Sequence, residues 1–526
     1  MRSKPQPAVV FVGIFIVVFL LHAPLLSLPY FWDEAGYYVP AARDLLLKGS
    51  LIPHTTVSNA HPPLVMAWVA LWWKLAGYAP VVARSAMVVI AAFSLLGIYR
   101  LAESVANRGV AIASTLCTAV YPVFFSQSSL VQVDLAAAGL IFWGLRAHIE
   151  GRWKATALWF SLAALAKETA IIAPLCLAAW EVIRRWPAVR RWLERWTEEF
   201  EVPAGSIVGL LIPVVPLMLW YLYHRAVTGY TFGNPEFFRY NVAATLNPLR
   251  FLLALMLRLW QGFGYLHLWV LTGAMLLLLM ESPVEDADGA RRRIAIPVQL
   301  TFFVVIVAYV VSMAIIGGAV LARYLLPAVP LVIIMAVSTL RRRLRYWTGA
   351  VAFVIVFFIV AWFFNPPYGY SPEDNLGYRD YVTIHQDAEH FLEARYPMAR
   401  VLTAWPASDE LARPWLGYTT RPLQVVRIED FSLEQILSAN DFRSHYDVAL
   451  LFSTKYEPPH PLLDRWQVWV RLKREFFGYE RDLPAAVAAQ MLGGQIVFSE
   501  QKKGQWAAVI ELKHEEILNA EARTAY

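Results

Sequence analysis

The sequence predicts a polytopic α-helical membrane protein with an α/β domain at its C-terminal end. Of the 526 residues, 58% are hydrophobic and 16% are charged, with a mean hydropathy of +0.46. Soluble domains have about 45–50% apolar residues, so this composition indicates an integral membrane protein. The composition changes after Phe364, where Pro366 and Pro367 open a linker and no apolar run of spanning length follows. We therefore expect a membrane domain at 1–364 and an extracytoplasmic α/β domain at 365–526.

About eleven apolar stretches approach the roughly 20 residues that a helix needs to cross the hydrocarbon. The first, residues 8–28, follows Arg2 and Lys4 and resembles a signal peptide. No small-residue cleavage site follows it, so we expect it to remain as an anchor. The other expected spans are residues 81–101, 110–125, 130–147, 153–166, 169–183, 207–223, 262–280, 294–316, 319–340 and 347–364.

Basic residues gather in every second loop between these spans, at 100–108, 146–154, 184–191, 291–293 and 341–345. Cytoplasmic loops carry the excess of Lys and Arg, so this alternation predicts a cytoplasmic N-terminus and a multi-pass protein of the inner or plasma membrane. The loops also account for the net charge of +6, so no nucleic-acid partner is expected. The outer face then holds Asp33, Asp134, Lys167, Glu168, Glu236, Arg323 and the C-terminal domain.

The C-terminal domain alternates helix-like and strand-like stretches, which is typical of an α/β fold. Expected strands are residues 400–403, 423–426, 448–452, 494–499 and 506–512, and expected helices are 385–396, 433–439 and 484–492. The domain has no glycine-rich phosphate loop and no nucleophile motif, so we interpret it as a recognition or support domain. It also lacks Asn-x-Ser/Thr sequons, which favours a prokaryotic membrane.

Ionisable residues concentrate at the outer ends of the spans. Asp33 and Glu34 follow the first span inside an aromatic run that includes Tyr37. The loop between the first two spans, residues 30–80, is far too long for a plain connection, and its stretches 35–47 and 64–75 are amphipathic enough to lie along the interface. Acids, cations and a histidine on one membrane face suit acid–base chemistry on a phosphate-bearing substrate. They are Asp33, Glu34, His61, Asp134, Lys167, Glu168, Arg323 and Tyr324.

Each of these residues also has a purely structural interpretation. Aspartate is a preferred N-cap residue, so Asp33 and Asp134 could each cap a helix. A capping aspartate can also be catalytic. His61 precedes two prolines and could be a turn residue held by backbone hydrogen bonds, since a lone histidine is more often structural than a ligand. Lys167 and Glu168 could form a local ion pair of little energetic value. Arg323 could extend to the lipid headgroups.

Four short motifs resemble those of the GT-C glycosyltransferases, especially the protein O-mannosyltransferases and the lipid A aminoarabinose transferases. They are Trp-Asp-Glu at 32–34, His-Pro-Pro-Leu at 61–64, Asp134, and Ala-Arg-Tyr-Leu-Leu-Pro at 322–327. The resemblance covers roughly the whole membrane part, and it implies a GT-C type fold. It also implies an inverting enzyme that moves a sugar from a polyprenyl phosphate to an acceptor on the outer face.

By this resemblance, Asp33 takes the position of the catalytic carboxylate, which accepts the proton of the acceptor hydroxyl. The leaving lipid phosphate needs cations, for which Arg323, Lys167 and His61 are the candidates. Asp134 and Glu34 would orient the sugar or those cations, and Tyr37, Glu168 and Tyr324 complete the predicted substrate-binding set. The acceptor, whether protein, lipid or cell-envelope glycan, is not identified by the sequence.

The sequence departs from the aminoarabinose transferases at one motif, since Ala60-His61 stands where those enzymes have Glu-Lys before the two prolines. This departure weakens an assignment to lipid A. Relatives differ in their need for a metal, and a divalent cation at Asp33, Glu34, His61 and Asp134 stays open. We expect no obligatory metal. Both cysteines, Cys117 and Cys176, lie in apolar stretches, which excludes a thiolate metal site.

Two other classes of protein agree less well with this pattern. A transporter or flippase of lipid-linked sugars would place its charges near mid-membrane on broken helices, whereas these charges lie at outer helix ends. A receptor or scaffold would leave the acids of the long first loop unexplained. The Asp286-Ala287-Asp288 sequence resembles the motif of nucleotide-sugar transferases, but no nucleotide-binding domain surrounds it, so a solvated acidic turn is expected.

Overall fold

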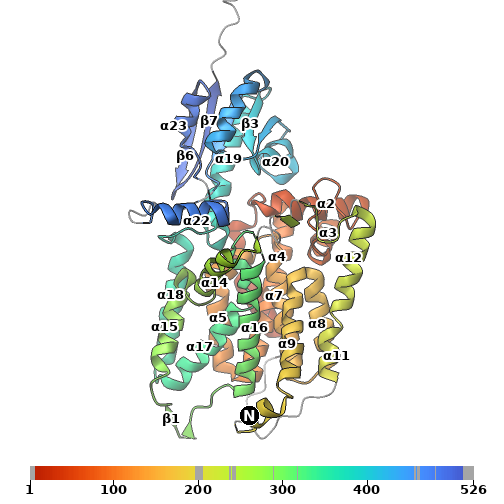
Figure 1. The fold of residues 1–526 in the computed structure, drawn as a ribbon, viewed down its shortest axis with the longest axis vertical. Coiled ribbons are helices and arrows are strands. Elements are labelled where there is room, and N and C mark those ends of the chain that lie inside the picture. Colours follow the sequence, from red (N-terminus) through yellow and green to blue (C-terminus); the bar gives the residue numbers. More distant parts are fainter. Residues whose placement is uncertain are drawn as a thin grey trace, which may run out of the picture. The chain divides into compact units, whose positions relative to one another are not determined.

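A computed structural model gives the fold of the chain (Figure 1). The residues described are 6–195, 205–235, 238–239, 245–287, 289–316, 318–454, 456, 458, 463–479 and 481–512; Glu236 and Asp288 lie outside them. The chain divides into two compact units. The membrane unit comprises Met1–Ser27, Tyr37–Pro366 and Glu373–Leu376, and the C-terminal unit comprises Leu28–Gly36, Pro367–Pro372 and Gly377–Tyr526.

The membrane unit is a bundle of helices, in which α4 packs against α1, α5 and α7, and α7 packs against α8. Several of these helices have proline in their first turn, where the missing N–H costs no hydrogen bond. The bounds of the helices are α1 (Pro7–His22), α2 (Val39–Lys48), α3 (Leu64–Ala76), α4 (Pro80–Val105), α5 (Arg108–Val120), α6 (Pro122–Gln127), α7 (Asp134–Ile149), α8 (Trp153–Ala166), α9 (Ile172–Ile183), α10 (Pro187–Glu194), α11 (Gly205–Leu211), α12 (Val214–Thr228), α14 (Pro248–Phe263), α15 (Leu268–Leu278), α16 (Ile296–Ile315), α17 (Val329–Arg343) and α18 (Trp347–Phe363).

Every expected span overlaps at least one helix of this bundle. Among the described residues, five helical stretches are long and apolar enough to cross a membrane, namely Pro7–Leu25, Pro80–Val105, Gly205–Thr228, Pro248–Leu278 and Ile296–Ile315. Shorter apolar helices cover Leu64–Ala76, Arg108–Val120 and Trp347–Phe363. The protein is therefore a multi-pass membrane protein, while the number of eleven spans stays a prediction.

The helix α14 was not expected from the sequence, because the corresponding expected span begins at residue 262. Asn247 caps this helix, since its side-chain oxygen accepts hydrogen bonds from the backbone N–H groups of Leu249 and Arg250. Arg250 and Arg258 are both buried on α14. Two arginines lower the mean hydropathy of an otherwise leucine-rich segment, and for that reason a search for apolar runs misses it.

The long first loop contains the two helices that its amphipathic stretches predicted, α2 and α3. Gly49 ends α2 with φ +67, the left-handed conformation that glycine adopts without strain. Asp44 of α2 is buried and accepts hydrogen bonds from the backbone N–H groups of His54 (2.6 Å) and Thr55 (2.7 Å). Asp44 therefore holds the loop that leads back towards His61, and this contact explains its charge without a catalytic role.

The C-terminal unit is built on a five-stranded sheet of order β4-β3-β5-β7-β6. All five predicted strands and all three predicted helices are confirmed, with end points that differ by a few residues, although α19 begins earlier than predicted. The strands β3, β4 and β5 are parallel, whereas β7 runs antiparallel to β5 and β6. The bounds are β3 (Arg400–Ala404), β4 (Gln424–Ile428), β5 (Val448–Phe452), β6 (Gly494–Lys502), β7 (Gln505–Leu512), α19 (Gly377–Arg395), α20 (Ala407–Ala412), α21 (Leu433–Ala439), α22 (Gln467–Phe477) and α23 (Ala485–Met491).

The segment Leu28–Gly36 belongs to the C-terminal unit, although it lies near the N-terminus and was expected in the membrane domain. Its backbone is anchored at Tyr30, whose N–H donates to the Leu416 carbonyl (3.4 Å) and whose carbonyl accepts from the Tyr418 hydroxyl (3.0 Å). Nothing in the sequence predicted this pairing of positions almost 400 residues apart.

Candidate active site

Asp33 lies at a strained point of the chain. The preceding residue, Trp32, has φ +43, a conformation that is a true outlier for a bulky side chain. Strain of this kind persists only where the surrounding structure imposes it, and it concentrates at functional sites. The π-helical turn Glu34–Tyr38 follows directly. We therefore retain Asp33 as the candidate catalytic carboxylate on an independent structural ground.

Glu34 has a clear structural function. Its side chain is fully buried, and its Oε2 atom accepts a hydrogen bond from the backbone N–H of Phe31 at 2.7 Å. The carboxylate thus closes the turn of residues 31–34, which contains Asp33 and is called the Asp33 turn below. A negative charge on this turn also lies at the start of the helical segment, where the backbone dipole favours it.

Aromatic side chains of the C-terminal unit contact the two residues that precede Asp33. The Phe31 ring lies edge-on to Tyr381 of α19 at 5.1 Å between centroids, and the Trp32 ring lies edge-on to Trp405 at 5.1 Å. Edge-to-face pairs at these distances contribute about 0.5–1.5 kcal/mol each beyond the area they bury. The position of Asp33 is therefore determined by the C-terminal unit.

Substitution of Gly36 by Ala tests this support. An added Cβ at Gly36 would lie 2.5 Å from the Trp405 ring, so the ring or the Asp33 turn must move. A displacement of about 1 Å at a reacting group costs on the order of 10²-fold in rate. We expect Gly36→Ala to lower turnover by about that factor with a small change in melting temperature. Gly13→Ala is the matched control, because nothing lies within 4 Å of an added Cβ there; equal activity of the two variants would contradict the prediction.

His61 and Glu168 form the first part of a polar network in the membrane unit. The Nδ1 atom of His61 lies 3.0 Å from Oε2 of Glu168, and the imidazole ring contacts the rings of Tyr37 (5.4 Å) and Tyr38 (5.7 Å). Ala60, directly before His61, is a second non-glycine residue in the left-handed region, with φ +58. Burial raises the pKa of Tyr37 to about 12, so its hydroxyl stays protonated and acts as a hydrogen-bond donor at neutral pH.

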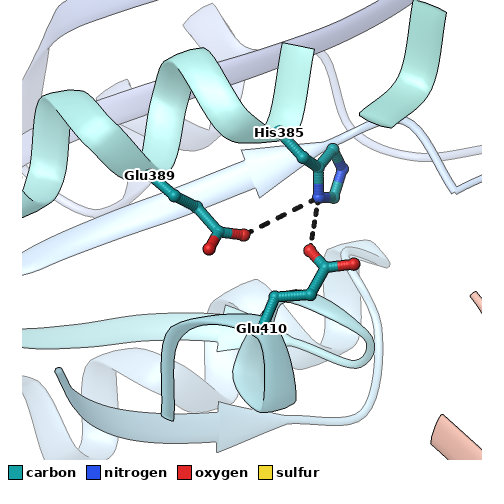
Figure 2. A group of neighbouring side chains, drawn as sticks. All are labelled: His385, Glu389 and Glu410. Carbon is teal, nitrogen blue, oxygen red and sulfur yellow. Dashed lines mark hydrogen bonds and ion pairs between the residues drawn. The ribbon is translucent and has the colours of Figure 1, made fainter. Parts of the chain in front are cut away.

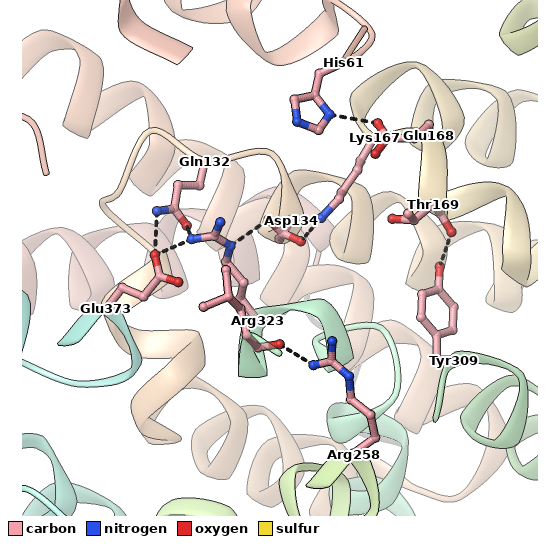
Figure 3. A network of polar contacts seen from close by, with 11 residues as sticks. His61, Gln132, Asp134, Lys167, Glu168, Thr169, Arg258, Tyr309, Arg323 and Glu373 are labelled. Carbon is pink, nitrogen blue, oxygen red and sulfur yellow. Dashed lines mark hydrogen bonds and ion pairs between the residues drawn. The ribbon is translucent and has the colours of Figure 1, made fainter. Parts of the chain in front are cut away.

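Asp134 is the centre of the network (Figure 3). One oxygen of its carboxylate contacts Nζ of Lys167, and Oδ2 lies 3.2 Å from Nε of Arg323. All three side chains are buried. The N-cap position of α7 is Val133, no side chain caps this helix, and Asp134 is its first helical residue. The capping interpretation of Asp134 is therefore wrong. Its charge balances two buried cations.

Arg323 has at least three polar partners among the described residues. Besides Asp134, its guanidinium donates to Oε1 of Gln132 (2.8 Å) and forms an ion pair with Glu373. Gln132 in turn donates to Oε2 of Glu373 at 2.9 Å. Burial inside the protein excludes the alternative in which Arg323 extends to the lipid headgroups. The local Lys167–Glu168 ion pair is likewise wrong, since Lys167 pairs with Asp134 and Glu168 pairs with His61.

Three cations surround the ring of Tyr324, at distances typical of cation–π contacts. Lys167 lies 4.1 Å from the ring centroid, Arg258 of α14 lies 5.4 Å from it, and Arg323 lies 5.6 Å from it. Arg258 donates through Nη1 to the Leu321 carbonyl (2.6 Å) and through Nε to the Met313 carbonyl (3.2 Å). Its Nη2 atom is buried and has no hydrogen-bond partner among the described residues.

The network contains three residues that the sequence analysis did not select, namely Gln132, Arg258 and Glu373. Two of them could have been selected from the sequence, because Gln132 precedes Asp134 by two positions and Arg258 is a charged residue in an otherwise apolar stretch. Glu373 could not have been selected in this way. It lies in the linker after the last span, and the segment Glu373–Leu376 returns to the membrane unit, where Asp374 accepts a hydrogen bond from the Tyr265 hydroxyl (2.7 Å).

The structure brings together seven of the nine predicted site residues within the membrane unit: Tyr37, His61, Asp134, Lys167, Glu168, Arg323 and Tyr324. Asp33 and Glu34 belong to the C-terminal unit. The rejected nucleotide-sugar motif behaves as expected as far as it is described. Asp286 lies in an exposed two-stranded turn and pairs with Arg291 at 2.7 Å.

Comparison with known proteins agrees with this architecture. Residues 60–223 match the family model of dolichyl-phosphate-mannose-protein mannosyltransferases. ArnT from Cupriavidus metallidurans bound to undecaprenyl phosphate is similar in structure, with a TM-score of 0.54, 15% identity, and coverage of 95% of this chain and 97% of that one. The apo state of the same protein matches with a TM-score of 0.50, 16% identity and the same coverage. No curated protein sequence matches.

The oligosaccharyltransferase of Archaeoglobus fulgidus in complex with Zn and sulfate is more distant, with a TM-score of 0.44, 12% identity, and coverage of 84% of this chain and 67% of that one. The ArnT match extends over 95% of this chain, so it includes residues of both the membrane unit and the C-terminal unit. The chain has a fold of the GT-C type, and its residues 60–223 match the family model of dolichyl-phosphate-mannose-protein mannosyltransferases.

Proposed function

We propose that this protein is an inverting glycosyltransferase that moves a sugar from a polyprenyl-phosphate donor to an acceptor hydroxyl on the outer face of the membrane. The observation that carries the proposal is the cation cluster around Tyr324. Arg258 presents a buried guanidinium nitrogen without a partner among the described residues, next to Lys167 and Arg323. A buried donor without an acceptor is costly, and a phosphate oxygen would satisfy it.

The reaction is a single displacement at the anomeric carbon. Asp33 accepts the proton of the acceptor hydroxyl, and the acceptor oxygen forms its bond to the anomeric carbon from the side opposite the phosphate. The bond between that carbon and the phosphate oxygen breaks, and its electrons leave with the lipid phosphate. That leaving group is anionic already, so it requires cations and no proton donor.

We assign the residues of the network to three groups. Arg258 and Lys167 face the Tyr324 ring and are proposed to contact the phosphate oxygens. Asp134, Glu373 and Gln132 hold Arg323 and Lys167 in place, so Arg323 is proposed to support the site electrostatically. Preorganised charges of this kind stabilise a transition state without reorganisation during the reaction.

His61, Glu168 and Tyr37 form the remaining group, which is proposed to contact the sugar. Tyr37 directly follows Gly36, so it connects this group along the chain to the turn of Asp33. Glu34 is proposed to act through the turn that it closes. We propose no obligatory metal in this site, because the cations of the chain itself balance the phosphate.

The sidedness of the protein is part of the proposal. The alternation of basic loops supports a cytoplasmic N-terminus and an extracytoplasmic C-terminal domain. Reporter fusions at Asp286 and at Asp387 should report opposite sides of the membrane, because an odd number of proposed spans separates these positions. The same side for both fusions would contradict this topology.

The direct test is incubation of the purified full-length protein with polyprenyl-phosphate sugars and a panel of protein, lipid and glycan acceptors. We expect sugar transfer, or slow hydrolysis of the donor when the acceptor is wrong, with inversion at the anomeric carbon. If no donor in the panel is consumed under any condition, the proposed function is wrong.

Arg258→Gln should weaken binding of the lipid phosphate by about 10–100-fold, because a hydrogen bond to a charged group contributes roughly 1.5–3 kcal/mol. The measurement is the rise in melting temperature of the protein as undecaprenyl phosphate is added. Arg190→Gln is the matched control, since this arginine lies on α10 in an exposed ion pair with Glu194. An unchanged lipid titration for Arg258→Gln would exclude Arg258 from the phosphate site.

A further inference from the structure

The C-terminal unit contains a second cluster of ionisable side chains, which the proposed reaction does not use. His385 and Glu389 lie four residues apart on α19, so both point from the same face of that helix. Figure 2 shows them directed toward Glu410 of α20. The Nδ1 atom of His385 lies 2.7 Å from Oε2 of Glu410 and 3.9 Å from Oε1 of Glu389.

All three side chains are buried, with His385 1% exposed and both glutamates 0% exposed. When both carboxyl groups are ionised, neither oxygen of Glu389 and only one oxygen of Glu410 accepts a hydrogen bond from a donor among the described residues. Buried carboxylates are normally paired or bound to a metal, because loss of water is costly for a charged group. Burial, and then the nearby charge of Glu410, raises the pKa of Glu389 well above its ordinary value.

The spacing of the donor atoms suits a metal ion. One ligand atom from each residue can be chosen so that all three lie within 4.8 Å of one another. Tetrahedral ligands held at about 2.1 Å from an ion are themselves about 3.4 Å apart, which falls between the two observed separations. One imidazole and two carboxylates are a donor set for Zn²⁺ or Mn²⁺, and two anionic ligands cancel the charge of a divalent ion.

We propose that His385, Glu389 and Glu410 bind a divalent transition-metal ion, Zn²⁺ or Mn²⁺, as a structural site in the C-terminal unit. The imidazole would bind through Nδ1, which places its ring proton on Nε2. The ion would satisfy the carboxylate oxygens that lack donors and would connect α19 to α20. This site is separate from the cations of the membrane unit, and the proposal does not depend on the proposed transfer reaction.

The location of the cluster explains what such an ion would stabilise. The His385 ring stacks on Tyr381 at 3.9 Å between centroids, and Tyr381 is the side chain that contacts Phe31. Glu410 belongs to the helix that follows Trp405, whose ring contacts Trp32. The metal would thus join α19, which carries Tyr381, to the helix that follows Trp405. An ion there would fix the support of the turn without contact to a substrate.

The test uses the full-length protein in detergent, stripped with EDTA, dialysed against Zn²⁺ or Mn²⁺, and analysed for bound metal by mass spectrometry. The wild-type protein should bind one more ion per chain than either Glu389→Gln or Glu410→Gln. Its melting temperature should rise on addition of the ion and fall on chelation, and the two variants should lack this response. Asp387→Asn is the matched control, because Asp387 is an exposed carboxylate on the same helix; it should behave as the wild type.

The melting temperature without metal checks that the variants fold. Without metal, Glu389→Gln should melt no lower than the stripped wild-type protein, because the substitution removes one of two buried, adjacent carboxylates. Equal metal content in wild type and both variants, together with melting temperatures that do not respond to chelation, would overturn the proposal. The two carboxylates would then share a proton in place of an ion.

Discussion

Asp33→Asn should lower the rate of sugar transfer by about 10²–10⁴-fold, the range that a positioned general base contributes. The amide has nearly the shape of the carboxylate but cannot accept the proton of the acceptor hydroxyl. Donor binding should persist, because the phosphate is assigned to Arg258 and Lys167 in the other unit. The measurement is single-turnover transfer at saturating donor, combined with a donor titration followed by melting temperature.

Asp387→Asn serves as the control for Asp33→Asn, since it changes one carboxylate of the C-terminal unit at an exposed position. It should transfer sugar at the wild-type rate. Asp33→Asn with wild-type transfer would exclude Asp33 as the base. Asp33→Asn with lost donor binding would instead mean that the carboxylate contacts the donor.

Asp134→Asn should destabilise the protein by about 3–5 kcal/mol, the usual cost of leaving a buried charge without its partner. The substitution removes the carboxylate that contacts both Lys167 and Arg323, and all three side chains are buried. We expect a lower melting temperature in detergent and a loss of transfer activity. The expected loss of stability exceeds that of any exposed ion pair in the membrane unit.

Glu150→Gln is the matched control for Asp134→Asn. Glu150 caps the other end of the same helix and forms a partly exposed pair with Arg146 at 2.8 Å, so its loss should cost less than about 1 kcal/mol. The double variant Asp134→Asn with Lys167→Met should recover part of the stability, because one unbalanced cation is removed as well. A double variant less stable than Asp134→Asn alone would contradict the charge-balance explanation.

Elements defined by local patterns were predictable. The strand Val448–Phe452 and the helix Leu433–Ala439 agree with the prediction at both ends, since an apolar run and a capped amphipathic turn are local signals. The helix α14 was not predictable from apolar runs, because Arg250 and Arg258 find their hydrogen-bond partners only in the folded bundle. These tertiary contacts explain how α14 can bury two arginines, although its charged residues alone argue against burial.

The candidate site was predictable in its membership more than in its roles. The ionisable residues at the expected helix ends could be selected from the sequence, and they include His61, Asp134, Lys167 and Arg323. In the structure these residues lie in one network of polar contacts. Their partners were not predictable, because ion pairs are decided by distances across helices far apart in the sequence. Arg323 is the example: its pairing with Glu373 crosses 50 positions.

The sequence by itself determined the membrane class, the order of helices, the strands of the C-terminal unit and the presence of an unusual acid at Asp33. Apolar length, period and motif are properties of neighbouring residues, so they can be seen without a fold. The tertiary structure decided that the Asp33 turn rests on the C-terminal unit, that Asp134 balances two cations, and that His385 lies beside two buried glutamates. Those facts depend on which distant side chains share a buried volume of low polarity, where each charge needs a partner.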